Sequence, residues 1–220
     1  LLTKAPASMP YCLPSLSLLE TRVLGTLLEK QRTVSDTYPL SLNSLVVGCN
    51  QKTSRNPLME VGEPEVLLAI ENLKELGFVS EVSGSRVVRF AHNFEKALGV
   101  PTQASALLTV LMLRGPQTAG ELRLNCERLH KFADISAVEA FLEELAERSA
   151  GALVVELPRL PGARENRWSH LLSGQPVIEA QGGGGAVVAA GLEIDELRGR
   201  VATLEAEVAE LREMVEQLLG

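Results

Sequence analysis

One order of elements occurs twice along this chain of 220 residues: three helical patterns, then two short β-type runs. In the helical patterns, apolar residues recur at spacings of three and four, as on the buried face of an amphipathic helix. The first pair of β-type runs covers residues 78–82 and 87–90, and the Ser-Gly-Ser between them predicts a hairpin. The second pair covers residues 152–157 and 166–171, with a loop rich in Pro and Gly between them. This duplicated order restricts the fold more than any other feature of the sequence.

Three helices followed by a hairpin is the order of a winged helix, which is a helix-turn-helix with an appended β-hairpin. We predict two such units in tandem, over residues 16–98 and 99–174. The fold class is then mainly α with small β-hairpins (α+β). The second helices of the two units also share the pattern Leu-x-x-x-Cys, at residues 45–49 and 122–126.

Local signals indicate where the helices begin and end. A Ser or Thr followed three residues later by Glu is a capping box, in which each side chain satisfies a free backbone N–H. The sequence contains three of them, at Ser17 and Glu20, at Thr118 and Glu121, and at Ser136 and Glu139. Pro39 and Pro64 are expected to open the second and third helices of the first unit, and Gly77 to cap the third. That third helix is expected to bury Val66, Ala69, Ile70, Leu73 and Leu76.

The last segment, residues 192–219, has a seven-residue repeat. β-branched residues occupy one position of each repeat and Leu the position three residues later, a choice that favours a parallel two-stranded coiled coil. These positions are Ile194, Leu197, Val201, Leu204, Val208, Leu211, Val215 and Leu218. We expect this helix to form a homodimer, and the alternative is an amphipathic helix that folds back on its own body. Residues 1–15 are expected to form a flexible arm, and residues 175–191 a Gly-rich linker.

Composition excludes several classes of protein. The longest stretch without a charge, residues 97–113, contains Gly and Pro and is too short to span a bilayer. The 3 cysteines lie far apart, so we expect neither a disulfide nor a zinc site, and a cytoplasmic location. Cys126 and His130 are one helical turn apart, but two ligands without a third favour a buried thiol over a metal site. Since no nucleophile motif or phosphate-binding loop is present, we expect no enzyme, no metal and no cofactor.

The net charge of −7 is unevenly distributed, because residues 186–220 hold 8 acidic and 3 basic groups while residues 1–185 are nearly neutral. Only a local basic patch is therefore available to nucleic acid. Residues 50–57 form one such patch, in which Lys52 and Arg55 are surrounded by polar residues and no acid. One interpretation is a loop that contacts phosphates. The other is a polar connector that ties the second and third helices by side-chain to backbone hydrogen bonds.

The two hairpins carry further candidate contacts to a nucleic-acid backbone. These candidates are Arg86, Arg89, Arg164 and Arg167. The alternative is a pair of solvated hairpins without a ligand. Phe90 and Trp168 lie at hairpin ends, where packing against the domain is favoured over stacking on a base.

A helix-turn-helix protein ordinarily reads DNA with its third helix. In the first unit the outward face of that helix carries Leu68, Glu71, Asn72 and Glu75, and in the second unit it carries Glu139, Glu143 and Glu147. Carboxylates are repelled by the phosphates that line a DNA groove, so these helices are poor readers. The leading hypothesis is a dimeric regulatory or accessory factor that binds nucleic acid, DNA above all, through the loop and the hairpins. The alternative is a protein–protein adaptor whose acidic third helices face a protein partner, with no direct DNA contact.

Longer motifs carry a family resemblance. The chain resembles the YceH family of bacterial proteins at residues 28–31 (LEKQ), 38–43 (YPLSLN), 49–57 (CNQKTSRNP), 113–123 and 164–174. The resemblance covers about residues 16–174 and implies tandem winged helices in the bacterial cytoplasm, with no established activity. The bacterial segregation and condensation protein B is similar in architecture only, and that analogy favours the adaptor.

Overall fold

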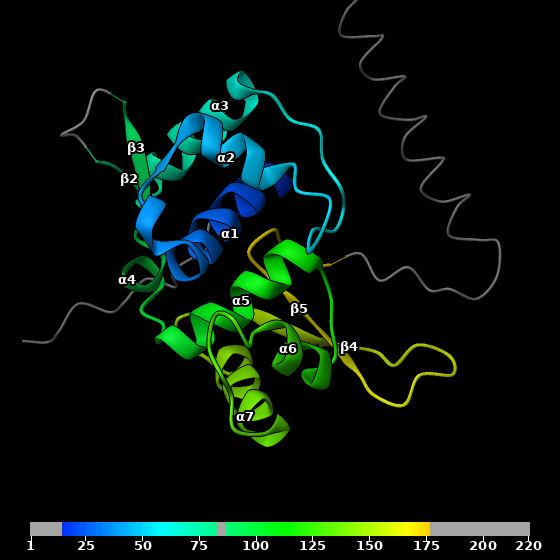
Figure 1. Cartoon of the computed structure of the whole chain (residues 1–220). Coiled ribbons are helices and arrows are strands. Elements are labelled where there is room, and N and C mark those ends of the chain that lie inside the picture. The colour runs from blue at the N-terminus through cyan, green and yellow to red at the C-terminus, as the bar shows by residue number, and fades with distance from the viewer. Residues whose placement is uncertain (1–14, 83–86, 177–220) are drawn as a thin grey trace, which may run out of the picture. The chain divides into compact units, whose positions relative to one another are not determined.

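The computed structural model describes residues 15–82 and 87–176 (Figure 1). The chain divides into two units, Leu1–Pro176 and Val177–Gly220, and every described residue belongs to the first. The heptad repeat, the Gly-rich linker beyond residue 176, the arm up to residue 14 and Arg86 lie outside the described residues. The roles predicted for them remain predictions.

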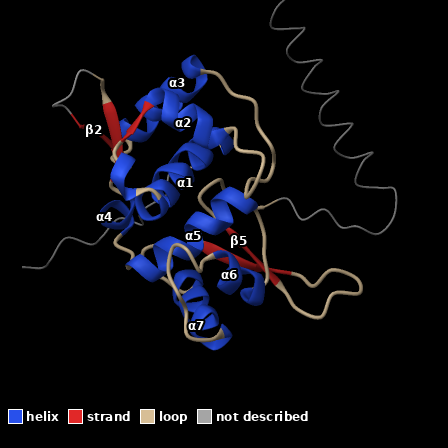
Figure 2. Ribbon diagram, in the orientation of Figure 1, coloured by secondary structure: helices blue, strands red, loops and turns tan. Residues whose placement is uncertain are grey.

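The described residues form two halves, which are mixed in secondary structure and separated near residue 99. The first half contains α1 (Leu18–Thr33), η1 (Ser35–Thr37), β1 (Leu40–Ser41), α2 (Leu42–Cys49), α3 (Glu63–Glu75), β2 (Val79–Val82), β3 (Arg89–His92) and α4 (Phe94–Leu98). The second half contains α5 (Thr102–Arg114), α6 (Ala119–Asn125), α7 (Ile135–Ala146), β4 (Val154–Leu157) and β5 (Arg167–His170). This part of the chain thus has seven α-helices and small antiparallel sheets (Figure 2), which confirms the predicted combination of helices with β-hairpins. None of its helices is long and apolar enough to cross a membrane.

The two halves repeat one strand order. In the first half β3 lies between β1 and β2, and Leu40 of β1 is opposite Phe90 of β3. In the second half β5 pairs with β4 on one side and forms an isolated antiparallel bridge on the other, between Trp168 and Gln117. In both halves, therefore, a residue just before the second helix pairs with the last strand. This shared topology makes the duplication stronger than the sequence alone indicated.

The helix starts follow the local signals in part. Two of the three predicted capping boxes are present, at the starts of α1 and α6. The third prediction is wrong, because Ser136 lies inside α7 and Asp134 caps that helix by accepting a hydrogen bond from the backbone N–H of Ala137. The start of α2 also lies later than predicted, since Ser41 rather than Pro39 provides its N-cap.

The buried face of α3 is as predicted except at its end. The buried residues are Val66, Ala69, Ile70 and Leu73. Leu76 is 41% exposed, so its predicted burial is wrong. Gly77 follows at a φ of 75°, its N–H donates to the carbonyl of Lys74, and the N–H of Phe78 donates to the carbonyl of Leu73. The left-handed backbone conformation of Gly77 ends the helix and turns the chain there, which leaves the side chain of Leu76 outside the core.

The helices α1 and α5 pack side by side at the centre of the described part and join its two halves (Figure 1). They are in close contact at Gly25, where a Cβ atom would lie 2.9 Å from Cδ2 of Leu113. Backbone hydrogen bonds add to this contact, from Asn56 N–H to the carbonyl of Leu113 (2.8 Å) and from Leu16 N–H to the carbonyl of Leu172 (2.7 Å). One apolar core continues through both halves. The two halves therefore form one body.

Two histidines of the sheets are held neutral by burial. His92 of β3 lies with Nε2 2.8 Å from Oε1 of Gln31. Burial lowers the pKa of His92 from its ordinary 6.5 to about 4, against a smaller upward effect of Glu95. Burial likewise lowers the pKa of His170 to about 4. Between pH 4 and pH 6.5 these histidines bind protons in the unfolded chain but not in the folded one. The free energy of unfolding therefore decreases as the pH falls from 6.5 towards 4.

We expect each of these histidines to remove on the order of 2 kcal/mol from the free energy of unfolding over that interval. Urea unfolding at a series of pH values measures this loss. In the double variant His92→Gln and His170→Gln, the free energy of unfolding should change less steeply with pH just below pH 6.5. Ordinary carboxyl groups do not yet titrate in that range. An identical slope in parent and double variant would contradict the assignment.

Candidate functional site

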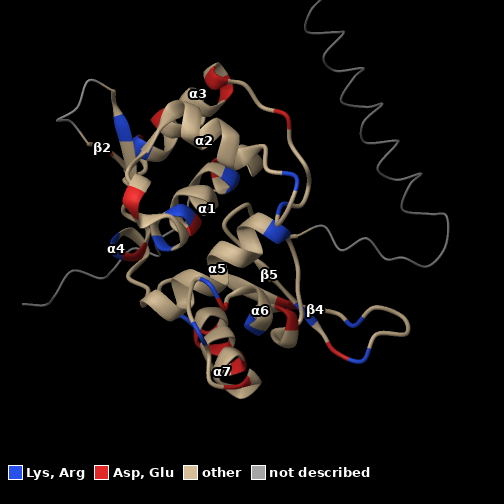
Figure 3. Ribbon diagram, viewed as in Figure 1, with Lys and Arg blue, Asp and Glu red and all other residues tan. Residues whose placement is uncertain are grey.

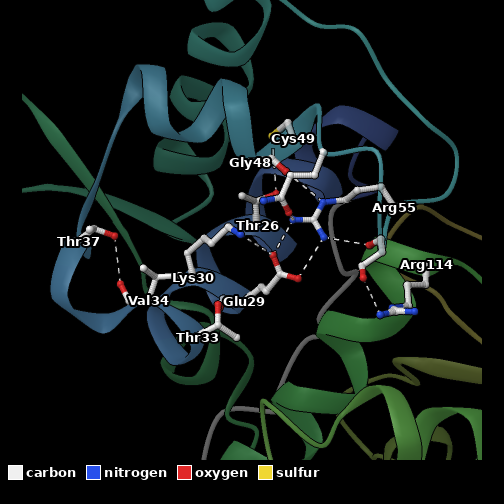
Figure 4. A network of polar contacts seen from close by, with 12 residues as sticks. Thr26, Glu29, Lys30, Thr33, Val34, Thr37, Gly48, Cys49, Arg55 and Arg114 are labelled. Atoms are coloured by element: carbon white, nitrogen blue, oxygen red, sulfur yellow. Dashed lines mark hydrogen bonds and ion pairs between the residues drawn. The ribbon is translucent and has the colours of Figure 1, made fainter.

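The loop between α2 and α3 contains Arg55, the first of the predicted phosphate contacts. The side chain of Arg55 is fully buried, and its guanidinium holds both carboxylate oxygens of Glu29, with Nη1–Oε1 at 3.1 Å and Nη2–Oε2 at 2.6 Å (Figure 4). Its Nε also donates to the carbonyl of Gly48 at 3.1 Å, and its Nη2 to Oε1 of Gln51 at 2.9 Å. The prediction that Arg55 contacts phosphate is therefore corrected, because the guanidinium is already bonded within the core. Arg55 serves instead as a connector between α1, α2 and the loop.

A second buried arginine, Arg22 of α1, supports the same loop. It is 1% exposed, and its Nη1 and Nη2 donate to the carbonyls of Cys49 (3.1 Å) and Pro57 (2.6 Å). Burial and the nearby charge of Arg55 lower the pKa of Arg22. The carbonyls at the end of α2 carry the negative end of the helix dipole, which these two guanidinium groups compensate. The sequence motif of residues 50–57 thus includes residues that hold the fold together.

The two cysteines of the repeated Leu-x-x-x-Cys pattern are both fully buried. Burial raises the pKa of Cys49, and that of Cys126 to about 12, so neither is a reactive thiolate near neutral pH. The Sγ of Cys126 donates to the carbonyl of Ala106, and His130 packs edge-on against Phe132. The predicted buried thiol at Cys126 is confirmed.

The remaining predicted cations do not gather into one surface. Lys52 and Arg164 are exposed in separate loops. Arg89 on β3 donates to two backbone carbonyls of the segment before α2, at 3.2 and 2.7 Å, and so helps to hold that segment. Arg167 is half-buried at the start of β5. Figure 3 shows the Lys and Arg residues dispersed over the described elements rather than lined up on one helix face.

The outward faces of α3 and α7 are as predicted. The residues exposed on them are Leu68, Glu71, Asn72, Glu75, Glu139, Glu143 and Glu147. One of these is bonded within the fold, because Nδ2 of Asn72 donates to Oε1 of Glu20 at 2.9 Å. Figure 3 shows acidic residues along α7. Both third helices therefore present carboxylates to solvent.

A groove of about 530 Å³ runs between α7 and the hairpin β4–β5, and we call it the acidic groove. Its residues are Glu139, Glu143, Ala146, Glu147, Ala152, Val154, Val155, Glu156, Trp168, Leu171 and Gln175. Glu156 and Trp168 are opposite one another across the hairpin. Among the residues that line this groove there is no Lys, Arg or His. The sequence did not indicate that Glu156 and Trp168 join the glutamates of α7, because only the strand register places them there.

The hairpin aromatics follow the favoured interpretation. Phe90 is 4% exposed within the core, and Trp168 packs against the core from a partly buried position. Phe90 is therefore not exposed for stacking on a base. Trp168 nevertheless contributes to the acidic groove, so packing and surface function are combined in one side chain.

This chain is similar to proteins of several bacteria. Residues 16–163 match the family model described as "Protein of unknown function, DUF480". A UPF0502 protein of Dechloromonas aromatica is 73% identical over 202 residues, which cover 92% of this chain and 95% of that protein. UPF0502 proteins of Burkholderia orbicola and Burkholderia pseudomallei are 56% and 58% identical over 213 and 208 residues, which cover 95% and 94% of this chain and 90% and 88% of theirs. These matches agree with the bacterial family expected from the motifs, and the chain belongs to the DUF480 family.

Proposed function

We propose that this protein is a cytoplasmic, non-enzymatic adaptor whose two halves are winged-helix units, and that the acidic groove binds a basic segment of a partner protein. The repeated topology supports the winged-helix assignment, since each half has three helices followed by a hairpin, and a residue before the second helix pairs with the second strand of that hairpin. The heptad repeat of the sequence supports a homodimer.

The uncompensated acidity of the groove carries the proposal. Glu139 and Glu143 lie one helical turn apart on α7, Glu147 is the C-cap residue of that helix, and Glu156 lines the groove from the hairpin. Of the hydrogen bonds in the described part, Glu156 has one from Nδ2 of Asn166 at 2.8 Å, and no cation neutralises the groove. Ala and Val side chains and the Trp ring supply apolar area between these charges. An amphipathic segment with Lys or Arg on one face satisfies both requirements, through charge-assisted hydrogen bonds and apolar burial.

DNA binding has weaker support in the structure than in the sequence. Duplex DNA carries about one negative charge per 1.7 Å of axis, so a helix with exposed carboxylates is repelled from its groove. Glu71 and Glu75 on α3 add to the glutamates of α7 in this respect. Arg55, the centre of the proposed phosphate contact, is buried in an ion pair.

A charge-neutral variant of α7 tests the adaptor. We expect the combined changes Glu139→Gln, Glu143→Gln and Glu147→Gln to reduce the capture of partner proteins from a bacterial lysate roughly tenfold or more, because several charge pairs are lost together. Quantitative mass spectrometry of the captured proteins measures this, with circular dichroism to show that the variant is folded. Because the three side chains are exposed, stability should change little.

The matched control places similar changes on the other third helix, Glu71→Gln and Glu75→Gln, where both side chains are exposed. It should keep the partners that the parent captures. Capture that is equal in all three proteins would contradict the acidic groove as the binding site. Salt-sensitive binding of duplex DNA that is lost on combining Lys52→Ala with Arg164→Ala would instead favour the nucleic-acid hypothesis.

A further inference from the structure

A second cavity, of about 240 Å³, lies where the two halves meet. We call it the junction cavity. It is formed by the end of α1, the loop after α2, the end of α5 and the turn after α6. Its polar and basic lining residues include Lys30, Gln51, Thr53, Ser54, Arg114 and Arg128. None of the three cations here was a candidate from the sequence, because they are separated by up to about a hundred positions and only the packing of α1 on α5 assembles them.

The charge of the junction cavity is positive. Lys30, Arg114 and Arg128 line it, and the single carboxylate among its lining residues is Glu29. That carboxylate is already paired with the buried guanidinium of Arg55, which also holds the pKa of Glu29 below its ordinary value despite the opposing effect of burial. The C-terminal ends of α1 and α5 line this cavity. Each helix end carries roughly half a negative charge from the helix dipole, which the nearby cations compensate.

The cations of the junction cavity are held in position to different degrees. Nη2 of Arg114 donates to Oγ of Ser54 at 2.7 Å, which fixes the guanidinium at the edge of the cavity (Figure 4). Nζ of Lys30 lies 3.4 Å from Oε2 of Glu29 and retains further donors. Arg128 is exposed and makes no hydrogen bond or ion pair with any other described residue. Hydroxyl and amide groups of Thr53 and Gln51 complete a polar lining.

We propose that the junction cavity binds a small phosphate-bearing molecule. Guanidinium groups match the oxygens of a phosphate in pairs, lysine adds a compact charge, and hydroxyls and amides supply neutral donors. Lys30, Gln51 and Thr53 belong to the first half of the described part, and Arg114 and Arg128 to the second. A ligand that contacts both groups binds the folded chain only, so it stabilises the association of the halves by mass action.

The test uses the full chain with inorganic phosphate and with pyrophosphate as probes. Ionic strength is held constant with NaCl, and sodium sulfate serves as the anion control. We expect saturable heat of binding and a rise in unfolding temperature for at least one of the two phosphate probes beyond that given by sulfate. Arg128→Gln should weaken that binding roughly tenfold, without changing the unfolding temperature of the ligand-free protein.

Lys131→Gln is the matched control, because Lys131 is an exposed cation three positions from Arg128 that does not line the junction cavity. It should bind the probe like the parent. An absence of saturable binding up to about 10 mM of either probe would overturn the proposal, as would equal binding by the Arg128→Gln variant. Sulfate that binds the parent and raises its unfolding temperature as strongly as the phosphate probes would mark a nonspecific anion effect and also overturn it.

Discussion

Replacing Glu29 by alanine is expected to lower the free energy of unfolding by about 3–5 kcal/mol, which is the usual cost of leaving a buried charge without its partner. The Arg55 side chain is fully buried, and the Glu29 carboxylate lies 2.6 Å from its Nη2. After the substitution the guanidinium keeps its bonds to backbone carbonyls but has no counterion in reach. Urea unfolding of the two proteins near neutral pH measures the difference.

Glu81→Ala is the matched control, because Glu81 pairs with Lys74 at the surface, where both side chains are more than a third exposed. An exposed pair of this kind contributes about 0.2–1 kcal/mol, so this control should unfold almost like the parent. The pH dependence gives a second check. The pKa of Glu29 is lowered in the folded state, so the stability it contributes is present above the ordinary carboxyl pKa and is lost as the pH falls through the folded value. The difference between parent and Glu29→Ala should therefore shrink in acid, and a loss below 1 kcal/mol near neutral pH would contradict this account.

Replacing Gly25 by leucine is expected to lower the free energy of unfolding by about 1–3 kcal/mol, because extra carbons must enter a packed contact between helices. A Cβ atom at Gly25 would lie 2.9 Å from Cδ2 and 3.0 Å from Cγ of Leu113, whose side chain is itself buried. Glycine in the middle of a helix costs about 1 kcal/mol relative to alanine, so its presence in α1 has a packing reason rather than a helical one. The expected result is a lower unfolding midpoint and weaker association of the two halves, visible as faster amide exchange at Asn56, whose N–H bonds to α5.

The control for this contact is Gly120→Ala in α6. At that position the nearest side-chain atoms to a new Cβ are 3.9 Å away, so nothing has to move. We expect this change to stabilise the protein by about 0.5–1 kcal/mol, the opposite sign from Gly25→Leu. Two glycine substitutions with the same sign and size would show that packing at Gly25 is not what keeps α1 and α5 together.

Prediction from the sequence was most successful where a structure is decided within one or two turns of chain. The capping boxes of α1 and α6, the buried residues of α3 and the outward glutamates of α7 all follow from spacing alone. Prediction from the sequence failed where two local signals compete for the same helix start. Ser136 and Asp134 are both good N-caps, and the structure uses Asp134 because the helix begins at Ile135.

The roles of the arginines depended on contacts that no local pattern contains. A sequence shows Arg55 as a cation in an acid-free loop, but Glu29 lies 26 positions earlier, and only the packing of the loop on α1 brings the two together. The same is true of Trp168, whose place beside α7 and opposite Gln117 follows from strand pairing. The junction cavity is a further case, because its cations come from both halves.

The sequence by itself determined the order of helices and hairpins, the duplication of that order, and the acidic character of the third helices. These depend on the spacing of apolar residues and on side chains that bond to nearby backbone groups, so neighbouring residues are enough to decide them. Only the tertiary structure decided which cations are buried, which remain at the surface, and that the two halves form one body. Those outcomes depend on desolvation and on partners far away in the chain, and neither is encoded at the position of the residue concerned.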